Sequence, residues 1–219
     1  MTSLYISNKR RIAEIAAVLL TAAGKFVFMD YLEWQLPFIA AAILSWTGYI
    51  SHRTRTAPGI TRYWGFRMDN FTTVLLRVLP FGIFAVVACV GTGFYQGTIL
   101  FTWHIIPILI LYPIWGIIQQ FLLIALTAGN MQDLKGQKLN KGTIILISAF
   151  LFAIVHFPIA WLIAGTFVLA LFYGWIYMGE RNIYVLGLFH GWIGGIFYYT
   201  VVNRDPFVVI FGRFFDLRE

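Results

Sequence analysis

The chain has 219 residues, of which 60% are apolar and only 11% are charged, and its mean hydropathy is +0.79. A soluble domain needs about a quarter of charged residues to cover its surface, so this composition excludes an ordinary soluble protein and predicts a lipid bilayer as the surroundings. The net charge of +7 does not indicate a nucleic-acid partner, because the Lys and Arg residues lie mainly in short segments between apolar runs.

Apolar runs of membrane-spanning length follow one another along the whole chain. We expect spans at about residues 12–29, 36–50, 72–90, 103–126, 143–157, 161–178 and 183–202. The fifth is expected to end at Pro158, which cannot donate a backbone hydrogen bond. The sequence therefore predicts an all-α fold, a polytopic membrane helix bundle of about seven transmembrane helices that forms a single domain over residues 1–219.

Basic residues indicate the orientation of these spans. They precede the first span, separate the second from the third, follow the fourth in a hydrophilic loop expected at 127–142, and separate the sixth from the seventh. The segments at 30–35 and 91–102, on the other side, contain no Lys or Arg. The positive-inside rule then places the N-terminus in the cytoplasm, and a bacterial inner (cell) membrane is the expected location. The 203–219 tail, with three arginines, then lies outside unless it runs along the membrane surface.

Polar side chains inside the predicted spans are candidates for a functional site, because such groups are costly in hydrocarbon and tend to face the interior of a bundle. Gln119 and Gln120 lie in the fourth span, His156 in the fifth and His190 in the seventh. Three helices could thus present two imidazoles and two carboxamides to a common cavity.

Helical spacing groups further residues with these candidates. Trp115 is one turn before Gln119, and Phe152 is one turn before His156, so each pair shares a helix face. A stripe of small residues at four-residue spacing lets another helix approach the seventh span closely. This stripe consists of Gly187, Gly191 and Gly195.

Each of these features also has a purely structural interpretation. A single intramembrane Gln more often joins two helices by a hydrogen bond than it takes part in chemistry, and the glycine stripe is explained by packing alone. A lone buried His is more often a satisfied core residue than a catalyst. Spacing alone therefore leaves the existence of a shared site open.

Three segments, in this order, resemble the CPBP family of polytopic intramembrane endopeptidases, also called Abi or CAAX-protease-like. The family pattern is Glu-Glu-x-x-x-Arg, then Phe-x-x-x-His, then His-x-x-x-Asn or Asp. The segment from Phe152 to His156 matches the second element in full, and His190 matches the first residue of the third. Gln119-Gln120 lies where Glu-Glu belongs, which is typical of a divergent branch. The resemblance covers about residues 112–206, the expected CPBP-like core.

The resemblance implies an intramembrane peptidase that cleaves a membrane-associated peptide or protein. The implied catalytic residues are Gln119, Gln120, His156 and His190, and the implied substrate-binding residues are Trp115, Phe152 and Gly194. The resemblance implies no cofactor. No metal is expected either, because two histidines without a nearby carboxylate or thiolate fall short of a usual zinc site with three protein ligands.

The departures from the family pattern all remove polar or charged groups. In the family, a glutamate is thought to act as the general base on a water held with the two histidines. Gln120, at the position expected for that glutamate, can orient a water but cannot accept its proton. Ile124 replaces the arginine, and Gly194 replaces the Asn or Asp. Hydrolysis would then need His156 or His190 as the base, since an imidazole titrates near neutrality.

Two functions follow from these observations and remain open at this point. One is an active peptidase in which His156 and His190 handle protons and the glutamines hold water or the scissile carbonyl. The other is a non-catalytic relative whose cavity binds a lipid, a prenyl chain or a partner transmembrane helix as an accessory subunit. A transporter or channel ranks last, because the sequence has no detectable inverted repeat and no acidic residue in the third to seventh spans.

Overall fold

The computed structural model describes residues 6–216, and these residues form helices without any β-strand. The segments labelled η have the wider π-helical winding. In chain order the elements are α1 (Asn8–Gly24), η1 (Lys25–Tyr31), α2 (Gln35–Thr56), α3 (Ile60–Trp64), α4 (Phe71–Gln96), α5 (Ile105–Gln120), η2 (Phe121–Gly129), α6 (Asn130–Asp133), α7 (Lys141–Ile154), α8 (Ala160–Gly179), α9 (Ile183–Phe197), η3 (Tyr198–Val202) and α10 (Pro206–Phe215).

Within the described chain, five helical stretches are long and apolar enough to cross a membrane. They are Asn8–Tyr31, Phe71–Gln96, Ile105–Asp133, Ala160–Gly179 and Ile183–Val202. The 22-residue α2 is joined to α1 by hydrogen bonds from Trp46 to Thr21 and from Tyr49 to Glu14, and the shorter, apolar α7 packs against α8. The structure thus confirms the predicted polytopic all-α bundle, and the protein is an integral membrane protein.

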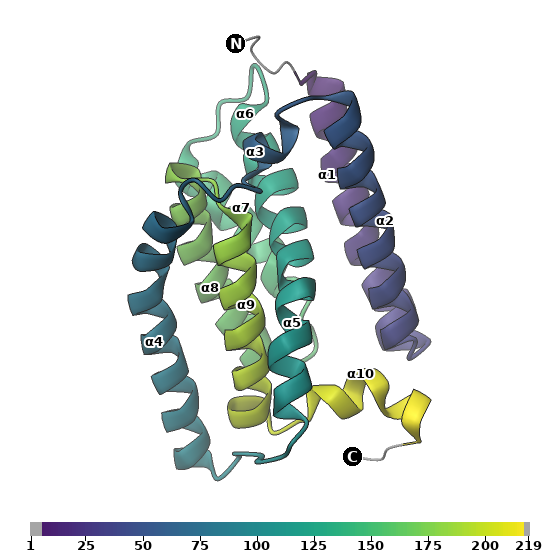
Figure 1. The fold of residues 1–219 in the computed structure, drawn as a ribbon, viewed down its shortest axis with the longest axis vertical. Coiled ribbons are helices and arrows are strands. Elements are labelled where there is room, and N and C mark those ends of the chain that lie inside the picture. The colour runs from purple at the N-terminus through teal and green to yellow at the C-terminus, as the bar shows by residue number, and fades with distance from the viewer. Residues whose placement is uncertain (1–5, 217–219) are drawn as a thin grey trace.

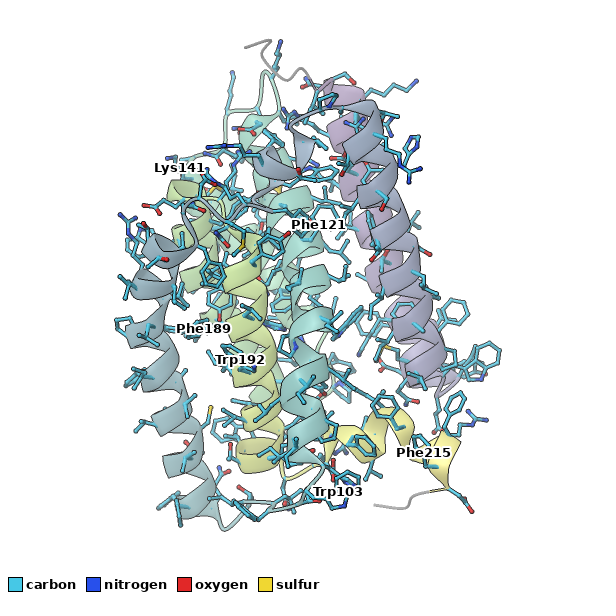
Figure 2. The ribbon with its side chains drawn as sticks, in the orientation of Figure 1. Trp103, Phe121, Lys141, Phe189, Trp192 and Phe215 are labelled. Carbon is cyan, nitrogen blue, oxygen red and sulfur yellow. The ribbon has the colours of Figure 1, made fainter. Side chains whose placement is uncertain are left out.

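The bundle has two parts, which Figure 1 separates clearly. The main part consists of α5 and α9 in contact at its centre, with α4 on one side and the α7–α8 pair behind them. The α1–α2 hairpin stands beside this main part. Figure 2 shows Lys141, at the start of α7, at the end of the bundle that holds the N-terminus, and Trp103 and Phe215 at the opposite end.

The tail after η3 forms α10, which lies across the end of the bundle opposite the N-terminus (Figure 1). Asp205 caps this helix by accepting hydrogen bonds from the backbone N–H groups of Phe207 and Val208. A helix that crosses the ends of the spans in this way is typical of a segment along a membrane surface. Arg218, counted with the tail in the sequence, lies outside the described residues.

Helix boundaries differ from the predicted spans where polar groups find partners inside the protein. The fourth span does not end at residue 126, because the chain continues as η2 and α6 to Asp133. Asn130, expected in a hydrophilic loop, is fully buried and bonds to Glu14 of α1. In the fifth span, by contrast, the helix ends at Ile154, three residues earlier than the predicted end at 157.

The contact between α5 and α9 depends on glycine. A Cβ atom added to Gly191 would lie 2.4 Å from the backbone nitrogen of Pro113, and one added to Gly187 would lie 2.4 Å from the Cα atom of Ile117. Both distances are far below van der Waals contact, so only glycine permits this approach. The close approach brings Gln119 of α5 next to His190 of α9.

A buried polar cluster joins α1 to the main part of the bundle near the N-terminus. The Glu14 carboxylate accepts a hydrogen bond from Asn130 Nδ2 at 2.7 Å, and Arg11 donates to Asn130 Oδ1 at 3.2 Å. Arg11 also bonds to the Tyr63 hydroxyl and lies 3.8 Å from Asp133. These hydrogen bonds away from water join one end of α1 to α3 and α6.

Candidate active site

A cavity of about 320 Å³ lies between η1, α5, the turn from α7 to α8, α9 and α10. Five residues selected from the sequence line it: Trp115, Gln119, His156, His190 and Gly194. The cavity thus collects side chains from the fourth, fifth and seventh predicted spans. Its walls are otherwise mostly apolar, which is the usual character of a site for a small or extended ligand.

His190 and Gln119 form a hydrogen bond across the α5–α9 contact. The Nε2 atom of His190 lies 2.9 Å from Oε1 of Gln119. Since a carbonyl oxygen only accepts, the His190 Nε2–H donates, and Nδ1 of the neutral ring carries a free lone pair. This Nδ1 atom is buried and has no hydrogen-bond partner among the described residues. His190 therefore has one unused acceptor at the site.

His156 reaches the same cavity because α7 is short. The 14 residues of α7 extend about 21 Å, which is less than the roughly 30 Å of a bilayer hydrocarbon core. Since α7 starts at the end that holds the N-terminus (Figure 2) and is shorter than the 26-residue α4, it ends part-way along the bundle, and His156 follows in the turn. His156 Nδ1 donates to the carbonyl oxygen of Phe152 at 2.8 Å, so its Nε2 atom is the free acceptor.

Phe152 connects the two histidines. Its ring centroid lies 4.8 Å from that of His156, edge to face, and 5.3 Å from that of His190. Phe152 itself is only 4% exposed and does not line this cavity, but it lines a neighbouring apolar groove. The residue predicted to bind substrate thus packs against both imidazoles and borders the space next to them.

The two adjacent glutamines lie in different surroundings. Gln119 lines the cavity, whereas Gln120 is fully buried and neither of its amide atoms has a hydrogen-bond partner among the described residues. Successive residues of a helix point about 100° apart, so only one of the pair faces the cavity. The structure brings Gln119 to the histidines and directs Gln120 into the protein core.

Gly194 leaves open space at the site. A Cβ atom added there would meet no heavy atom within 4 Å, in contrast to Gly187 and Gly191 of the same helix. Its position on the cavity wall shows that a larger side chain is sterically permitted.

A comparison with models of known protein families adds to this geometry. The model of the family described as Type II CAAX prenyl endopeptidase Rce1-like matches residues 59–196. That segment covers more than half of the chain and contains Gln119, His156 and His190. The chain belongs to this family. Searches of curated proteins and of solved structures found no match.

The match confirms the CAAX-protease-like resemblance expected from the three motif segments. Where the family pattern has Glu, Glu, Arg and Asn or Asp, this chain has uncharged residues at all four positions, namely Gln119, Gln120, Ile124 and Gly194. The matched segment begins at α3 and ends in α9, so the α1–α2 hairpin and α10 lie outside it. Both of these outer elements nevertheless contribute to the cavity wall.

Three charged residues that line the cavity, Lys25, Asp30 and Arg204, were not selected from the sequence. Lys25 of η1 donates to the Asp30 carboxylate at 2.7 Å and to the carbonyl oxygen of Phe157 at 3.1 Å. Asp30 is the one carboxylate among the described residues that line the cavity. The sequence does contain a sign of this site, since Lys25 lies inside the first predicted span, where a charge without a partner is costly.

A second, almost wholly apolar groove of about 340 Å³ adjoins the cavity between α1 and the α5 and α7 helices. Residues that line both spaces are Lys25, Trp115, Gln119 and Val155. Leu122, Leu151 and Phe26 are among the apolar side chains that complete the groove. A hydrocarbon group in this groove would lie next to the imidazole cavity.

Metal chemistry has little support in the side chains at hand. Over residues 6–216, no group of three or more His, Cys, Asp or Glu side chains has an arrangement that could hold a metal ion. The polar groups that line the cavity include the imidazoles, the Gln119 carboxamide, the Lys25–Asp30 pair and the Arg204 guanidinium.

Proposed function

We propose that the protein is an intramembrane peptidase that hydrolyses a peptide bond in a membrane-associated peptide or protein. The observation that carries this proposal is the hydrogen bond between His190 and Gln119 in a cavity shared with His156. Its position inside the segment matched by the prenyl endopeptidase family is the second support.

The free acceptor of His156 suits a hydrolytic water. His156 Nε2 has a lone pair that can accept a hydrogen bond from a water molecule in the cavity, whereas His190 Nδ1 is buried and His190 acts through its bond to Gln119. The oxygen lone pair of such a water is then available for the scissile carbonyl carbon. In this scheme His156 takes the proton as the C–O bond forms, and returns it to the leaving amine nitrogen as the C–N bond breaks.

Gln119 has a different task in this scheme. Its Oε1 atom fixes His190, and its amide nitrogen has two donors that are not used by the described residues. These donors can stabilise the negative charge that develops on the carbonyl oxygen in the transition state. Because a carboxamide cannot accept a proton at neutral pH, the base in this proposal is an imidazole, in place of the glutamate of the family pattern.

The apolar groove supports a lipid-modified substrate. The family description names a prenyl endopeptidase, and the groove beside the imidazoles offers apolar walls. We infer that this groove holds a prenyl chain, or a hydrocarbon chain of similar length, attached to the substrate near the scissile bond. Burial of such a chain would position the peptide segment in the neighbouring cavity.

The distribution of basic loops supports an orientation for this chemistry. We infer that the N-terminus lies in the cytoplasm, most simply of a bacterial inner membrane. Arg204, just before α10, lines the cavity, and α10 lies across the end of the bundle opposite the N-terminus (Figure 1). In this orientation the α10 side of the cavity faces the outer side of the membrane.

A cleavage assay tests the proposal. The purified protein in lipid nanodiscs is incubated with a farnesylated, fluorophore-labelled peptide, and the products are identified by mass spectrometry. Cleavage by the wild type is expected, with a loss of about 10²-fold or more in His156→Ala and in His190→Ala. His52→Ala, which removes an exposed histidine of α2, is the matched control. Cleavage that persists in both cavity variants would overturn the proposal.

A further inference from the structure

The α1–α2 hairpin contributes to the candidate site although it lies outside the family-matched segment. Its connecting region supplies Lys25, Met29, Asp30 and Gln35 to the cavity wall. The match begins only at residue 59. One charged pair of the cavity, Lys25 with Asp30, therefore comes from a part of the chain that the family motif does not describe.

The hairpin is attached to the main part of the bundle unevenly. Near the N-terminus, Arg11 and Glu14 bond to Asn130, and Asn8 bonds to Lys135. Along its length this part of the hairpin is the least buried of the spanning stretches. In its most apolar 18 residues, α1 with η1 has 6% of the residues buried, whereas α9 with η3 has 61%. Beyond α1, the direct polar contact of the hairpin with the α7–α8 turn is the bond from Lys25 to Phe157.

That contact falls beside a residue of the candidate site. Phe157 follows His156 in the turn after α7, where backbone carbonyls have lost the partners that a continuing helix would provide. The Lys25 ammonium supplies a donor to the Phe157 carbonyl oxygen at 3.1 Å. Satisfying this carbonyl restrains the peptide unit next to His156.

The π-helical winding of η1 explains how Lys25 is oriented. A π-helix forms i to i+5 hydrogen bonds, so residues five apart lie close together on one face. Lys25 and Asp30 have this separation, and their charged groups are 2.7 Å apart. The carboxylate therefore neutralises the ammonium and directs it toward the α7–α8 turn. An ammonium has three donors, enough for both partners.

We propose that Lys25 is a positioning residue of the active site: its ammonium, oriented by Asp30, holds the α7–α8 turn so that His156 faces the cavity. The role of Lys25 in catalysis rests on the proposed peptidase function, whereas the restraint that Lys25 places on the α7–α8 turn does not depend on it. Because Lys25 also lines the apolar groove, the same side chain forms part of the wall between the groove and the cavity.

A distance measurement tests the hold on the turn without any substrate. In a Cys89→Ala background, Val27→Cys in η1 and Trp161→Cys at the start of α8 provide two exposed positions for spin labels. Electron double resonance in nanodiscs should give one narrow distance distribution. Lys25→Met is expected to broaden or lengthen it, and Lys25→Arg, which retains donors, to preserve it. Lys138→Met, in the loop before α7, is the control.

Kinetic measurements test the positioning role itself. Loss of the correct placement of a catalytic group costs about 10²-fold in rate, so Lys25→Met is expected to lower kcat by that order with little change in KM. Lys25→Arg should recover most of the rate, and Asp30→Asn, which removes the ion pair but leaves the Lys25 donor, should give an intermediate kcat.

The two sets of measurements separate the possible failures. An unchanged spin-label distance in Lys25→Met would overturn the proposal that this residue holds the turn. An unchanged kcat in Lys25→Met, in a protein that cleaves peptide, would overturn the positioning role. A wild type that cleaves none of the peptides would contradict the peptidase function, while the distance measurement would still decide whether Lys25 restrains the turn.

Discussion

His190 of α9 donates a hydrogen bond from Nε2 to Oε1 of Gln119 of α5, at 2.9 Å. This bond joins two of the three motif segments of the Rce1-like family inside one cavity. It also shows which of the two adjacent glutamines belongs to the cavity, since Gln119 bonds to His190 and Gln120 does not. The consequences for function and stability can be measured separately.

The first prediction concerns the lost carboxylate. Gln119→Glu introduces a proton acceptor beside the His190 Nε2–H and the cavity, and general acid–base catalysis contributes on the order of 10²-fold or more. We expect the cleavage rate of the farnesylated peptide to rise by about that factor. The measurement is kcat under saturating substrate.

Gln120→Glu is the matched control for this change. Because the Gln120 amide is fully buried without hydrogen-bond partners among the described residues, a carboxyl group there gains no contact with the histidines. We expect no gain in rate and a loss of roughly 1–3 kcal/mol in stability, from thermal unfolding in detergent. A rate increase in Gln120→Glu but not in Gln119→Glu would show that the wrong glutamine has been assigned to the cavity.

The second prediction concerns the glycine contact between α5 and α9. In Gly191→Ala the new methyl group would lie 2.4 Å from the Pro113 backbone nitrogen, so the helices must move apart. We expect a loss of about 1–3 kcal/mol in stability together with lower activity. In Gly194→Ala the methyl group enters open space, and the higher helix propensity of Ala should leave stability equal or slightly raised. Equal stability of the two variants in thermal unfolding would contradict the observed packing.

The third prediction concerns the apolar groove. Ala22→Trp places an indole among the groove residues, whereas Leu20→Trp places it at an exposed position of the same helix. Excluding two methylene groups of a bound chain would cost about 1.6 kcal/mol, which corresponds to a KM roughly tenfold higher. We expect this rise for the farnesylated peptide in Ala22→Trp alone.

An unprenylated peptide of the same sequence provides the internal comparison for that experiment. Its KM should not respond to Ala22→Trp, because it leaves the groove empty. If both peptides lose the same affinity, the groove does not hold the hydrocarbon chain.

The fourth prediction concerns the buried cluster that anchors α1. Glu14 is only 3% exposed and accepts hydrogen bonds from Asn130 and Tyr49. Glu14→Ala removes the acceptor of the half-buried Tyr49 hydroxyl and one of the two acceptors of the buried Asn130 Nδ2, which also donates to Leu126, and we expect a loss of about 1–3 kcal/mol in stability. Glu14→Gln keeps one acceptor oxygen and should lose less. A thermal unfolding temperature unchanged in Glu14→Ala would show that the cluster does not secure the hairpin.

Several features of the fold follow from local sequence alone. The lengths of the apolar runs are enough to predict the membrane class and the succession of helices, because a bilayer core demands long helices of apolar residues. The sequence also singled out His156 and His190, since polar side chains are conspicuous in such runs. The sequence does not predict the early end of α7 at Ile154, because the apolar run continues beyond that residue.

Other features depend on how the helices are rotated and packed. Gln119 and Gln120 are identical in composition and adjacent in sequence, and only the rotation of α5 against α9 determines which one faces the cavity. The polar residues around Asn130 predict a loop, yet Glu14, more than a hundred residues earlier, provides a buried partner and the helix continues.

The sequence by itself determined that this is a helical membrane protein with a CAAX-protease-like set of motif residues. Tertiary structure alone decided that Gln119 and the histidines share a cavity, and that Lys25 and Asp30 join them from the hairpin. The physical reason is that hydrophobicity and helix length are properties of short segments, whereas hydrogen-bond partners across a bundle depend on close contacts between helices distant in the chain.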